Sequence, residues 1–216
     1  MSKSPKRPTR LLFVGNSFTA RNDLPSLIAQ LAAARGITIE HALLSMGGAS
    51  LRMHWNKGEA HTAIQRGKFD YVILQEQSTL PIKNAARMRE NVLLFDDAIR
   101  AAGAKTVLYM TWARRHMPDK QKVITEAYEF IGREVGALVV PVGKVWWRFI
   151  AKHDSPVLYD KDQSHPTVAG SYLAACVFLT ALFGENPVGL ESQIRGLSMQ
   201  DVQIVQQAVA EQLARS

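Results

Sequence analysis

The sequence of 216 residues contains a single cysteine, Cys176. An internal disulfide is therefore impossible, and a zinc ribbon or finger with several cysteine ligands is excluded. Because structural disulfides persist in oxidising compartments, this cysteine usage favours a reducing, cytoplasmic location. No apolar run approaches the roughly 18 residues that a membrane-spanning helix needs, so we expect no membrane partner.

The sequence has little excess charge outside its start. Lys and Arg total 26, Asp and Glu total 19, and much of the net charge of +7 lies in the first residues, MSKSPKRPTR. The remainder is too weakly basic to predict a nucleic-acid partner. The apolar stretch that follows, LLFV, is shorter than the roughly 7–15 residues of a secretory signal. We interpret residues 1–10 as a flexible basic leader and residues 11–216 as a single domain.

Short apolar runs alternate with longer helix-like stretches. The runs are continuous rather than alternating, which is typical of strands covered on both faces in a parallel sheet. This alternation predicts an α/β fold, a three-layer α/β/α sandwich with a five-stranded parallel sheet. The expected strands are residues 11–14, 37–44, 69–74, 106–111 and 137–140. The expected helices follow Asp23 and then cover residues 51–66, 85–102, 120–135, 144–151, 167–183 and 199–214.

Polar or glycine-rich segments follow four of the expected strands. Ligands bind beyond the carboxyl ends of the strands in such a sheet, so these segments are where a site is expected. They can supply the parts of an acyl-transfer site, which are a nucleophile, a base, an orienting acid and oxyanion donors. The segments are GNSFT at 15–19, SMGGAS at 45–50, QEQS at 75–78 and TWARR at 111–115, together with DQSHPT at 162–167 before a predicted helix.

Ser17 is the candidate nucleophile. It follows the first expected strand, and Gly15 before it permits a tight backbone that projects the hydroxyl into the crevice. A serine hydroxyl becomes an effective nucleophile only when a base takes its proton. Taken alone, a serine here is better explained as a helix cap or a turn residue, because serine is a common cap.

His165 is the candidate base and Asp162 the candidate acid. A spacing of three residues within a turn lets the carboxylate reach imidazole Nδ1 and leaves Nε2 free to accept the Ser17 proton. Pro166 is expected in the first turn of the helix that follows. Asp160 is a competing acid with a less suitable spacing, and a simple turn with a local cap is the other explanation of the pair.

Candidate oxyanion donors follow the second and third expected strands. Gly47 and Gly48 offer backbone N–H groups that a substrate oxygen can approach without a Cβ in the way. Gln77, or as a second choice Gln75, offers a side-chain amide. An ordinary turn explains the glycines as well, and a satisfied loop amide explains either glutamine.

Together these segments resemble the SGNH hydrolases, the GDSL-like esterase/lipase superfamily, from Leu11 to about Phe183. The family's G-D-S block appears as Gly15-Asn16-Ser17, and its D-x-x-H block as Asp162-Gln163-Ser164-His165. The family's G-x-N-D block is replaced by Gln75-Glu76-Gln77-Ser78, where Gln77 aligns with the asparagine. The resemblance implies a flavodoxin-like fold, a triad of Ser17, Asp162 and His165, and an oxyanion hole formed by Ser17, Gly47 or Gly48, and Gln77.

The resemblance implies a serine esterase that hydrolyses small O-acyl esters, with acetyl and carbohydrate esters among the candidates. It implies no metal and no organic cofactor, and a small-molecule ester as the partner. The alternative is a catalytically silent small-molecule or carbohydrate-binding protein on the same fold, which the replaced G-x-N-D block keeps open. The sequence leaves the acyl group, the alcohol and the oligomeric state open.

The remaining candidates have weaker signals. Trp112 follows the fourth expected strand and can form a wall of the substrate site. His54 and His61, seven residues apart, resemble a metal pair, but a third ligand is not evident and a polar helix face explains them. Cys176 lies in an apolar helix and is interpreted as inert packing.

Overall fold

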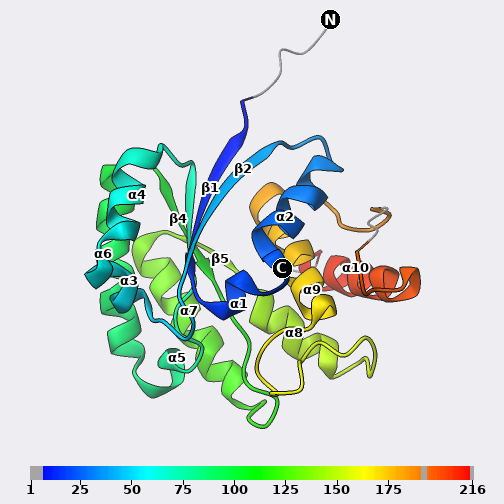
Figure 1. The fold of residues 1–216 in the computed structure, drawn as a ribbon. Coiled ribbons are helices and arrows are strands. Elements are labelled where there is room, and N and C mark those ends of the chain that lie inside the picture. Colours follow the sequence, from blue (N-terminus) through cyan, green and yellow to red (C-terminus); the bar gives the residue numbers. More distant parts are fainter. Residues whose placement is uncertain (1–6, 191–193, 215–216) are drawn as a thin grey trace, which may run out of the picture.

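The computed structural model describes residues 7–190 and 194–214. Within these residues, five parallel strands form one sheet in the order β2-β1-β3-β4-β5 (Figure 1). The predicted α/β sandwich with a five-stranded parallel sheet is therefore confirmed. The strands are β1 (Thr9–Gly15), β2 (Ile39–Ser45), β3 (Tyr71–Leu74), β4 (Lys105–Tyr109) and β5 (Leu138–Val140).

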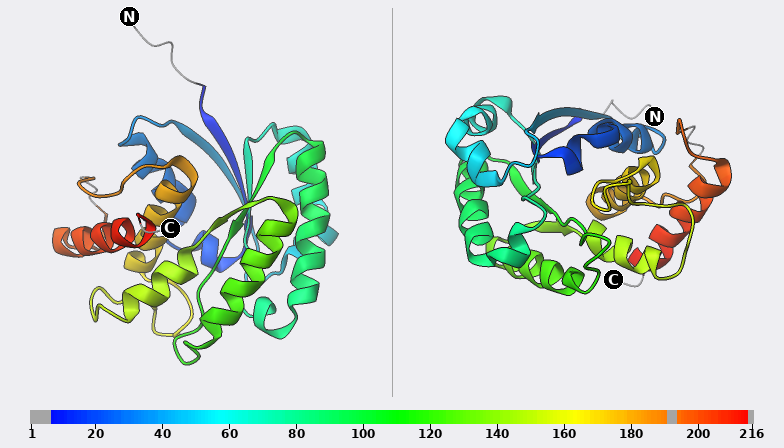
Figure 2. Two further views of the ribbon diagram at one scale, coloured as in Figure 1. Left: turned by 180° about the vertical axis from the view of Figure 1, so that it is seen from behind. Right: turned by 60° about the horizontal axis from the view of Figure 1, so that its bottom comes forward.

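Helices cover both faces of the sheet, which makes the three layers visible in Figures 1 and 2. One face carries α3 (Leu51–Lys57), α4 (Glu59–Gly67), α6 (Ala85–Ala101) and α7 (Lys120–Val135). The other carries α2 (Leu24–Ala33), α8 (Val142–Ile150) and α9 (Val168–Phe183), with α10 (Met199–Leu213) packed on α9. Three short elements, α1 (Ser17–Ala20), η1 (Arg21–Asp23) and α5 (Leu80–Lys83), lie in loops.

Alternate residues of the central strand enter opposite cores. Leu11 and Phe13 pack in the core beneath α2, α8 and α9, whereas Leu12 and Val14 pack in the core beneath α3, α6 and α7. All four side chains are fully buried. Burial on both faces explains why β1 is a continuous apolar run in the sequence, as expected for a parallel sheet.

The parallel register brings separate loops to one edge of the sheet. Gly15 at the end of β1 pairs with Ser45 at the end of β2, and Val14 pairs with Leu74 at the end of β3. The segments that follow these three strands therefore start side by side. This carboxyl edge lies at the bottom of Figure 1 and comes forward in the right-hand view of Figure 2.

Two helix predictions are wrong in detail. The expected helix 51–66 is divided into α3 and α4 at Gly58, whose φ of +79° is left-handed and ends the first helix. Pro166 lies outside α9 rather than in its first turn. Thr167 is the N-cap instead, since its side chain accepts a hydrogen bond from the Gly170 N–H at 3.2 Å.

The predicted basic leader, residues 1–10, falls partly outside the described residues, which begin at Arg7. Of the described part, Thr9 and Arg10 belong to β1, and the Arg7 guanidinium pairs with Asp70. Asp70 also accepts the Arg10 N–H at 2.8 Å, which holds the start of β1 in place.

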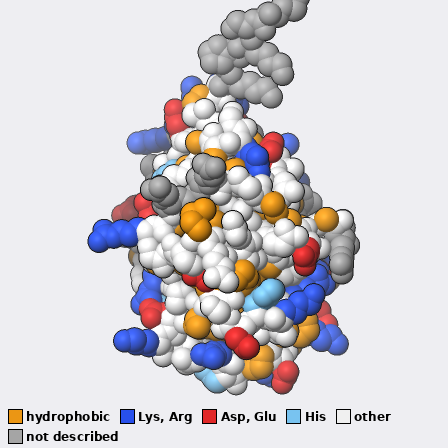
Figure 3. Space-filling model, turned by 90° about the vertical axis from the view of Figure 1, so that its right-hand side faces the viewer, with side chains coloured by type: hydrophobic (Ala, Val, Ile, Leu, Met, Phe, Trp, Pro, Cys, Tyr) orange, Lys and Arg blue, Asp and Glu red, His pale blue; other side chains and the backbone are white. Residues whose placement is uncertain are grey.

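Acidic and basic side chains are interspersed on the side of the molecule where α10 lies, as Figure 3 shows. Among the described helices, none is both long enough and apolar enough to cross a bilayer.

Candidate active site

Ser17 begins α1, and Asn16 alone separates it from the end of β1. Its half-buried Oγ lies 2.7 Å from Nε2 of His165, a residue 148 positions later in the chain. The structure thus brings the predicted nucleophile and the predicted base into direct hydrogen-bond contact. At this distance the hydroxyl can pass its proton to the imidazole.

Asn16 holds the turn that presents Ser17. Its Oδ1 accepts the Phe18 N–H at 3.1 Å, and its Nδ2 donates to the Ala49 carbonyl at 3.0 Å. A carboxylate is acceptor-only when ionised, so an aspartate here can cap α1 but cannot make the second bond. The second bond joins the turn at Ser17 to the loop that contains Gly47 and Gly48.

Asp162 makes two hydrogen bonds with His165 and one with Ser164. One carboxylate oxygen bonds to imidazole Nδ1, and the other accepts the backbone N–H groups of Ser164 at 3.0 Å and His165 at 2.9 Å. A proton held on Nδ1 leaves Nε2 as the acceptor that faces Ser17. Residues 17, 165 and 162 therefore form one continuous hydrogen-bonded chain.

The pKa of Asp162 reflects the same contacts. Partial desolvation by itself raises this pKa, but the hydrogen bonds from the His165 ring and from the two backbone N–H groups outweigh it and hold the pKa well below its ordinary value. Asp162 is therefore ionised at neutral pH, as a group that stabilises an imidazolium must be.

The competing acid, Asp160, has a different partner. Its carboxylate pairs with the Arg21 guanidinium and accepts the Lys161 N–H at 2.7 Å, and its pKa is lowered by these hydrogen bonds. The structure therefore places Asp162, not Asp160, on the His165 ring.

Arg21 and Asn22 were not identified from the sequence. Asn22 Nδ2 donates to the Thr167 carbonyl at 3.1 Å and to Ser171 Oγ at 2.9 Å. The Arg21–Asp160 pair and these two bonds connect the segment after Ser17 to both ends of the loop that contains His165, at Asp160 and at Thr167. Asn22 has a φ of +56°, a left-handed conformation that asparagine tolerates better than most residues. This preference is the one local feature of the sequence that could have indicated a turn at Asn22.

Trp112 is buried rather than exposed to a substrate. Its side chain is 1% exposed and stacks on Trp146, with ring centroids 3.8 Å apart. Its Nε1–H donates to the Ser164 carbonyl at 3.0 Å. The prediction that Trp112 forms a wall of the substrate site is therefore wrong, because packing between the sheet edge and α8 covers the ring. Its contact supports the loop that carries His165.

We expect Trp112→Phe to lower the free energy of unfolding by about 1–3 kcal/mol, because the buried Ser164 carbonyl loses its donor. Trp147→Phe is the matched control, since Trp147 is 48% exposed and we expect a change within about 0.5 kcal/mol. Chemical denaturation measures both values. Equal losses in the two variants would show that the Ser164 contact contributes nothing.

Gly47 and Gly48 form an exposed turn after β2. Gly48 has a φ of +67°, which disfavours residues with a side chain. Within the described part of the chain, the N–H groups of Ser17, Gly47 and Gly48 donate no hydrogen bond to another residue. These donors are therefore free to bind a ligand oxygen.

The two candidate glutamines differ sharply. Gln75 is fully buried, and its Oε1 accepts the Asn16 N–H at 2.8 Å and the Thr19 hydroxyl at 3.0 Å. Its Nε2 donates to the Glu76 carbonyl at 2.6 Å. Because this amide is engaged and inaccessible, the second choice of Gln75 as oxyanion donor is wrong in this arrangement.

Gln77 is half-buried. Its Oε1 accepts both the N–H and the hydroxyl of Thr79, at 2.9 and 3.0 Å. These bonds turn the Gln77 NH₂ group away from Thr79. Within the described residues, this NH₂ group has no hydrogen-bond partner. The geometry therefore favours Gln77 over Gln75 as an available amide donor.

The two histidines of the possible metal pair, His54 and His61, have structural partners. His54 is 4% exposed, and its Nε2 donates to the Gly15 carbonyl at 2.7 Å, while burial lowers its pKa. His61 packs edge-on against Trp55, on a different helix from His54. Within the described residues, no three His, Cys, Asp or Glu side chains are arranged to hold a metal. Cys176 is fully buried, which raises its pKa to about 12.

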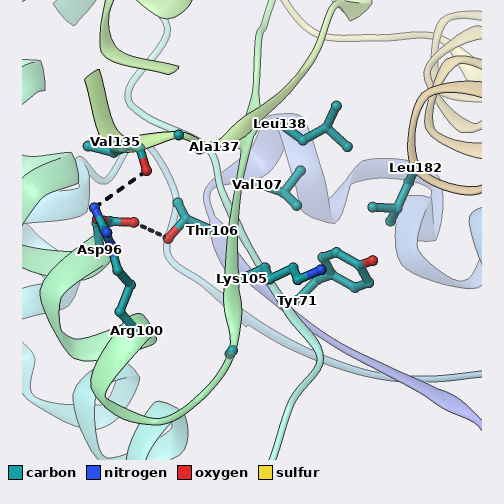
Figure 4. A pocket seen from close by; sticks show the side chains of 12 residues that line it. Tyr71, Asp96, Arg100, Lys105, Thr106, Val107, Val135, Ala137, Leu138 and Leu182 are labelled. Atoms are coloured by element: carbon teal, nitrogen blue, oxygen red, sulfur yellow. Dashed lines mark hydrogen bonds and ion pairs between the residues drawn. The ribbon is translucent and has the colours of Figure 1, made fainter. Parts of the chain in front are cut away.

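A separate cavity of about 490 Å³ lies at the opposite, amino edge of the sheet (Figure 4). Its lining includes Lys105 and Thr106 at the start of β4 and Tyr71 at the start of β3. In Figure 4 Asp96 points toward Thr106, and Arg100 lies beside it. None of Ser17, Asp162 and His165 lines this cavity, so it is not part of the candidate site.

Solved structures with the same fold define the class of protein. A Slackia heliotrinireducens protein assigned as an SGNH hydrolase is 29% identical, with a TM-score of 0.71, over 82% of this chain and 100% of that chain. A DUF4886 family protein from Bacteroides uniformis is 19% identical, with a TM-score of 0.79, over 96% and 95%. The lipase/acylhydrolase from Enterococcus faecalis is 17% identical, with a TM-score of 0.65, over 82% and 96%.

The chain therefore has the α/β/α fold of the SGNH hydrolases. The resemblance to the SGNH, or GDSL-like, superfamily that the sequence motifs indicate is confirmed by the Slackia heliotrinireducens neighbour, and the other two neighbours share the fold. No family model and no curated protein sequence matches the chain.

Proposed function

We propose that this protein is a serine esterase that hydrolyses small O-acyl esters, among them acetyl or carbohydrate esters. The observation that carries the proposal is the hydrogen-bonded chain from Ser17 Oγ through His165 to the Asp162 carboxylate. The fold supports it, because the structural neighbours include a lipase/acylhydrolase and an esterase inhibited by monoethylphosphonate.

In the proposed reaction, Ser17 Oγ attacks the ester carbonyl while His165 Nε2 takes the hydroxyl proton. Asp162 keeps the imidazole in the required tautomer and stabilises the imidazolium. The tetrahedral intermediate collapses when His165 returns the proton to the leaving alcohol, which leaves an acyl group on Ser17. Water then attacks the acyl-enzyme with His165 as base and releases the acid.

The negative charge on the carbonyl oxygen needs donors that are already in place. The N–H of Ser17, an N–H from Gly47 or Gly48 and the Gln77 amide are the proposed donors, and the absence of bonds from them to other described residues supports this role. Each donor of this kind contributes about 3–4 kcal/mol to transition-state stabilisation. No step of this mechanism calls for a metal ion or an organic cofactor.

Hydrolysis of p-nitrophenyl acetate and covalent labelling by a fluorophosphonate test the proposal. We expect ester turnover at neutral to mildly alkaline pH, and a fluorophosphonate adduct that peptide mapping assigns to Ser17. Purified protein that shows neither turnover nor labelling would favour the alternative, a binding protein that uses the same crevice without chemistry.

We expect Gln77→Ala to lower kcat by about 10²–10³-fold with little change in KM, because the amide acts on charge that develops in the transition state. Gln65→Ala on the exposed face of α4 is the control and leaves both constants unchanged. Steady-state kinetics with p-nitrophenyl acetate measure the two variants. A Gln77→Ala variant with the kcat of the wild type would remove Gln77 from the proposed oxyanion hole.

A further inference from the structure

Glu76 is a buried carboxylate at the carboxyl edge of the sheet. It follows β3 and is 1% exposed. Its Oε1 accepts the Leu51 N–H at 3.0 Å and the Gln77 N–H at 2.7 Å. Its Oε2 accepts from Asn91 Nδ2 at 2.8 Å. One side chain thus links its own segment to two others, at Leu51 and Asn91, which lie 25 and 15 residues away in the sequence.

The segments at Leu51 and Gln77 contain or adjoin proposed oxyanion donors, and Asn91 supports the segment at Leu51. Leu51 opens α3 immediately after the loop that contains Gly47 and Gly48, and Gln77 is the proposed amide donor. Asn91 on α6 is itself held, because its Oδ1 accepts from Arg52 Nε at 3.0 Å. Glu76, Asn91 and the first residues of α3 therefore form a closed ring of hydrogen bonds.

Burying a carboxylate in this position carries a desolvation penalty that its hydrogen bonds must offset. Burial raises the pKa of Glu76, and the N–H donors of Asn91, Gln77 and Leu51, with the nearby Arg52 charge, oppose that shift. α3 and α6 also pack through the rings of Trp55 and Phe95, whose centroids are 5.2 Å apart, so the polar ring is not their only contact. The ring of hydrogen bonds also fixes the distance between the loop that contains Gly47 and Gly48 and the loop that contains Gln77.

We propose that Glu76 is a positioning residue of the oxyanion hole, which holds the Gln77 backbone and the exit of the Gly47-Gly48 loop in one fixed arrangement. This inference rests on the proposed esterase function. The adjacent Gln75 has the corresponding role for the nucleophile, since its Oε1 accepts the Asn16 N–H. Three consecutive side chains, Gln75, Glu76 and Gln77, thus connect the nucleophile turn, the glycine loop and the amide donor.

This assignment accounts for the difference from the G-x-N-D block. A glycine in place of Gln75 leaves the Asn16 N–H without its buried acceptor. The Gln75 side chain in turn requires Gly15, since a Cβ at position 15 would lie 2.7 Å from Gln75 Oε1. Gly15 and Gln75 therefore fit each other as a pair.

The test compares Glu76→Gln with Asp96→Asn. Asp96 is a second buried carboxylate, 2% exposed, which accepts from Thr106 Oγ1 at 2.6 Å and Arg100 Nε at 2.7 Å beside the cavity of Figure 4. We expect Glu76→Gln to lower kcat for p-nitrophenyl acetate by about 10–100-fold with KM within about twofold, since supporting partners typically have effects of this size. Asp96→Asn lowers the melting temperature but keeps kcat within about twofold of the wild type.

A double-mutant cycle gives a second readout that a purely structural role would not produce. If Glu76 acts through Gln77 as well as through the glycine loop, the rate loss of the double variant Glu76→Gln/Gln77→Ala is clearly smaller than the product of the two single losses. Should Glu76→Gln fail to fold, Asn91→Ala weakens the same ring more gently, and we expect a decrease in kcat of about 3–10-fold with an unchanged KM.

The outcomes separate this inference from the proposed function. A wild-type protein without ester turnover and without Ser17 labelling refutes the esterase itself. Two results with an active wild type refute only the role of Glu76. In the first, Glu76→Gln or Asn91→Ala keeps the kcat of the wild type, as Asp96→Asn does. In the second, the kcat losses of Glu76→Gln and Gln77→Ala multiply fully in the double variant.

Discussion

Ser17→Ala is expected to lower kcat for p-nitrophenyl acetate by about 10⁶-fold and to abolish fluorophosphonate labelling. The variant retains the proposed oxyanion donors and the Asn16 cap, so turnover remains above that of water and the fold is unchanged. Stopped-flow or steady-state kinetics and thermal melting measure the two effects separately. A loss of this size at constant stability is explained only by removal of the nucleophile.

Ser26→Ala is the matched control for this variant. Ser26 is half-buried on α2 and makes one long contact, 3.4 Å from His41 Nε2. We expect its kcat to equal that of the wild type. Hydrolysis that continues undiminished in Ser17→Ala would mean that another group, or a contaminating enzyme, does the chemistry.

Asp162→Asn has the second-largest expected effect, a decrease in kcat of about 10⁴-fold. The amide can keep the geometry of the turn, but it donates toward Nδ1 and so favours the tautomer in which Nε2 carries the proton and cannot accept from Ser17. The low pKa of Asp162 means that the change removes a full negative charge at neutral pH. Kinetics from pH 6 to 9 measure the loss, which we expect at every pH in that range.

Asp160→Asn tests whether the correct acid has been chosen. Asp160 lies two residues earlier in the same loop and pairs with Arg21 instead of His165. We expect this variant to stay within about tenfold of the wild type, since it weakens a support of the loop and leaves the imidazole partner intact. If Asp160→Asn were the more damaging change, the assignment of roles in the loop would have to be reversed.

The depressed pKa of Asp162 also has a consequence for acid stability. A carboxyl group whose pKa is lower in the folded state stabilises the fold above its unfolded-state pKa, and this contribution is lost as the pH falls through the folded-state value. Because the pKa of Asp162 is lowered on folding, the wild type loses free energy of unfolding as the pH falls below about 4. We expect Asp162→Asn to lose less free energy of unfolding over the same pH range.

Much of the architecture is predictable because its signals are local. β1, β3, β4 and β5 each contain a short apolar run, and burial on both faces forces that pattern on β1. β2 differs, since Glu40 and His41 occupy exposed positions within it. The break at Gly58 was missed because apolar and polar residues continue with helical spacing through it. Only the left-handed backbone at that glycine separates α3 from α4.

The motifs also indicated which side chains to look for. Ser17 after the first strand and the spacing from Asp162 to His165 predicted a contact that the structure contains, at 2.7 Å between Oγ and Nε2. The roles of these residues in catalysis stay predictions. Spacing alone did not decide between Gln75 and Gln77, since both follow the same strand by a few residues.

By itself, the sequence determined the class of fold, the order of the strands and helices along the chain, and the short list of chemically capable residues, because these depend on neighbours a few positions apart. Tertiary structure alone decided that Trp112 is covered by Trp146, that Gln75 is enclosed beneath Gly15, and that Glu76 joins α3 to α6. Such outcomes depend on which distant segments occupy the same space. Hydrogen bonds between residues 15 or more positions apart leave no periodic pattern in the sequence.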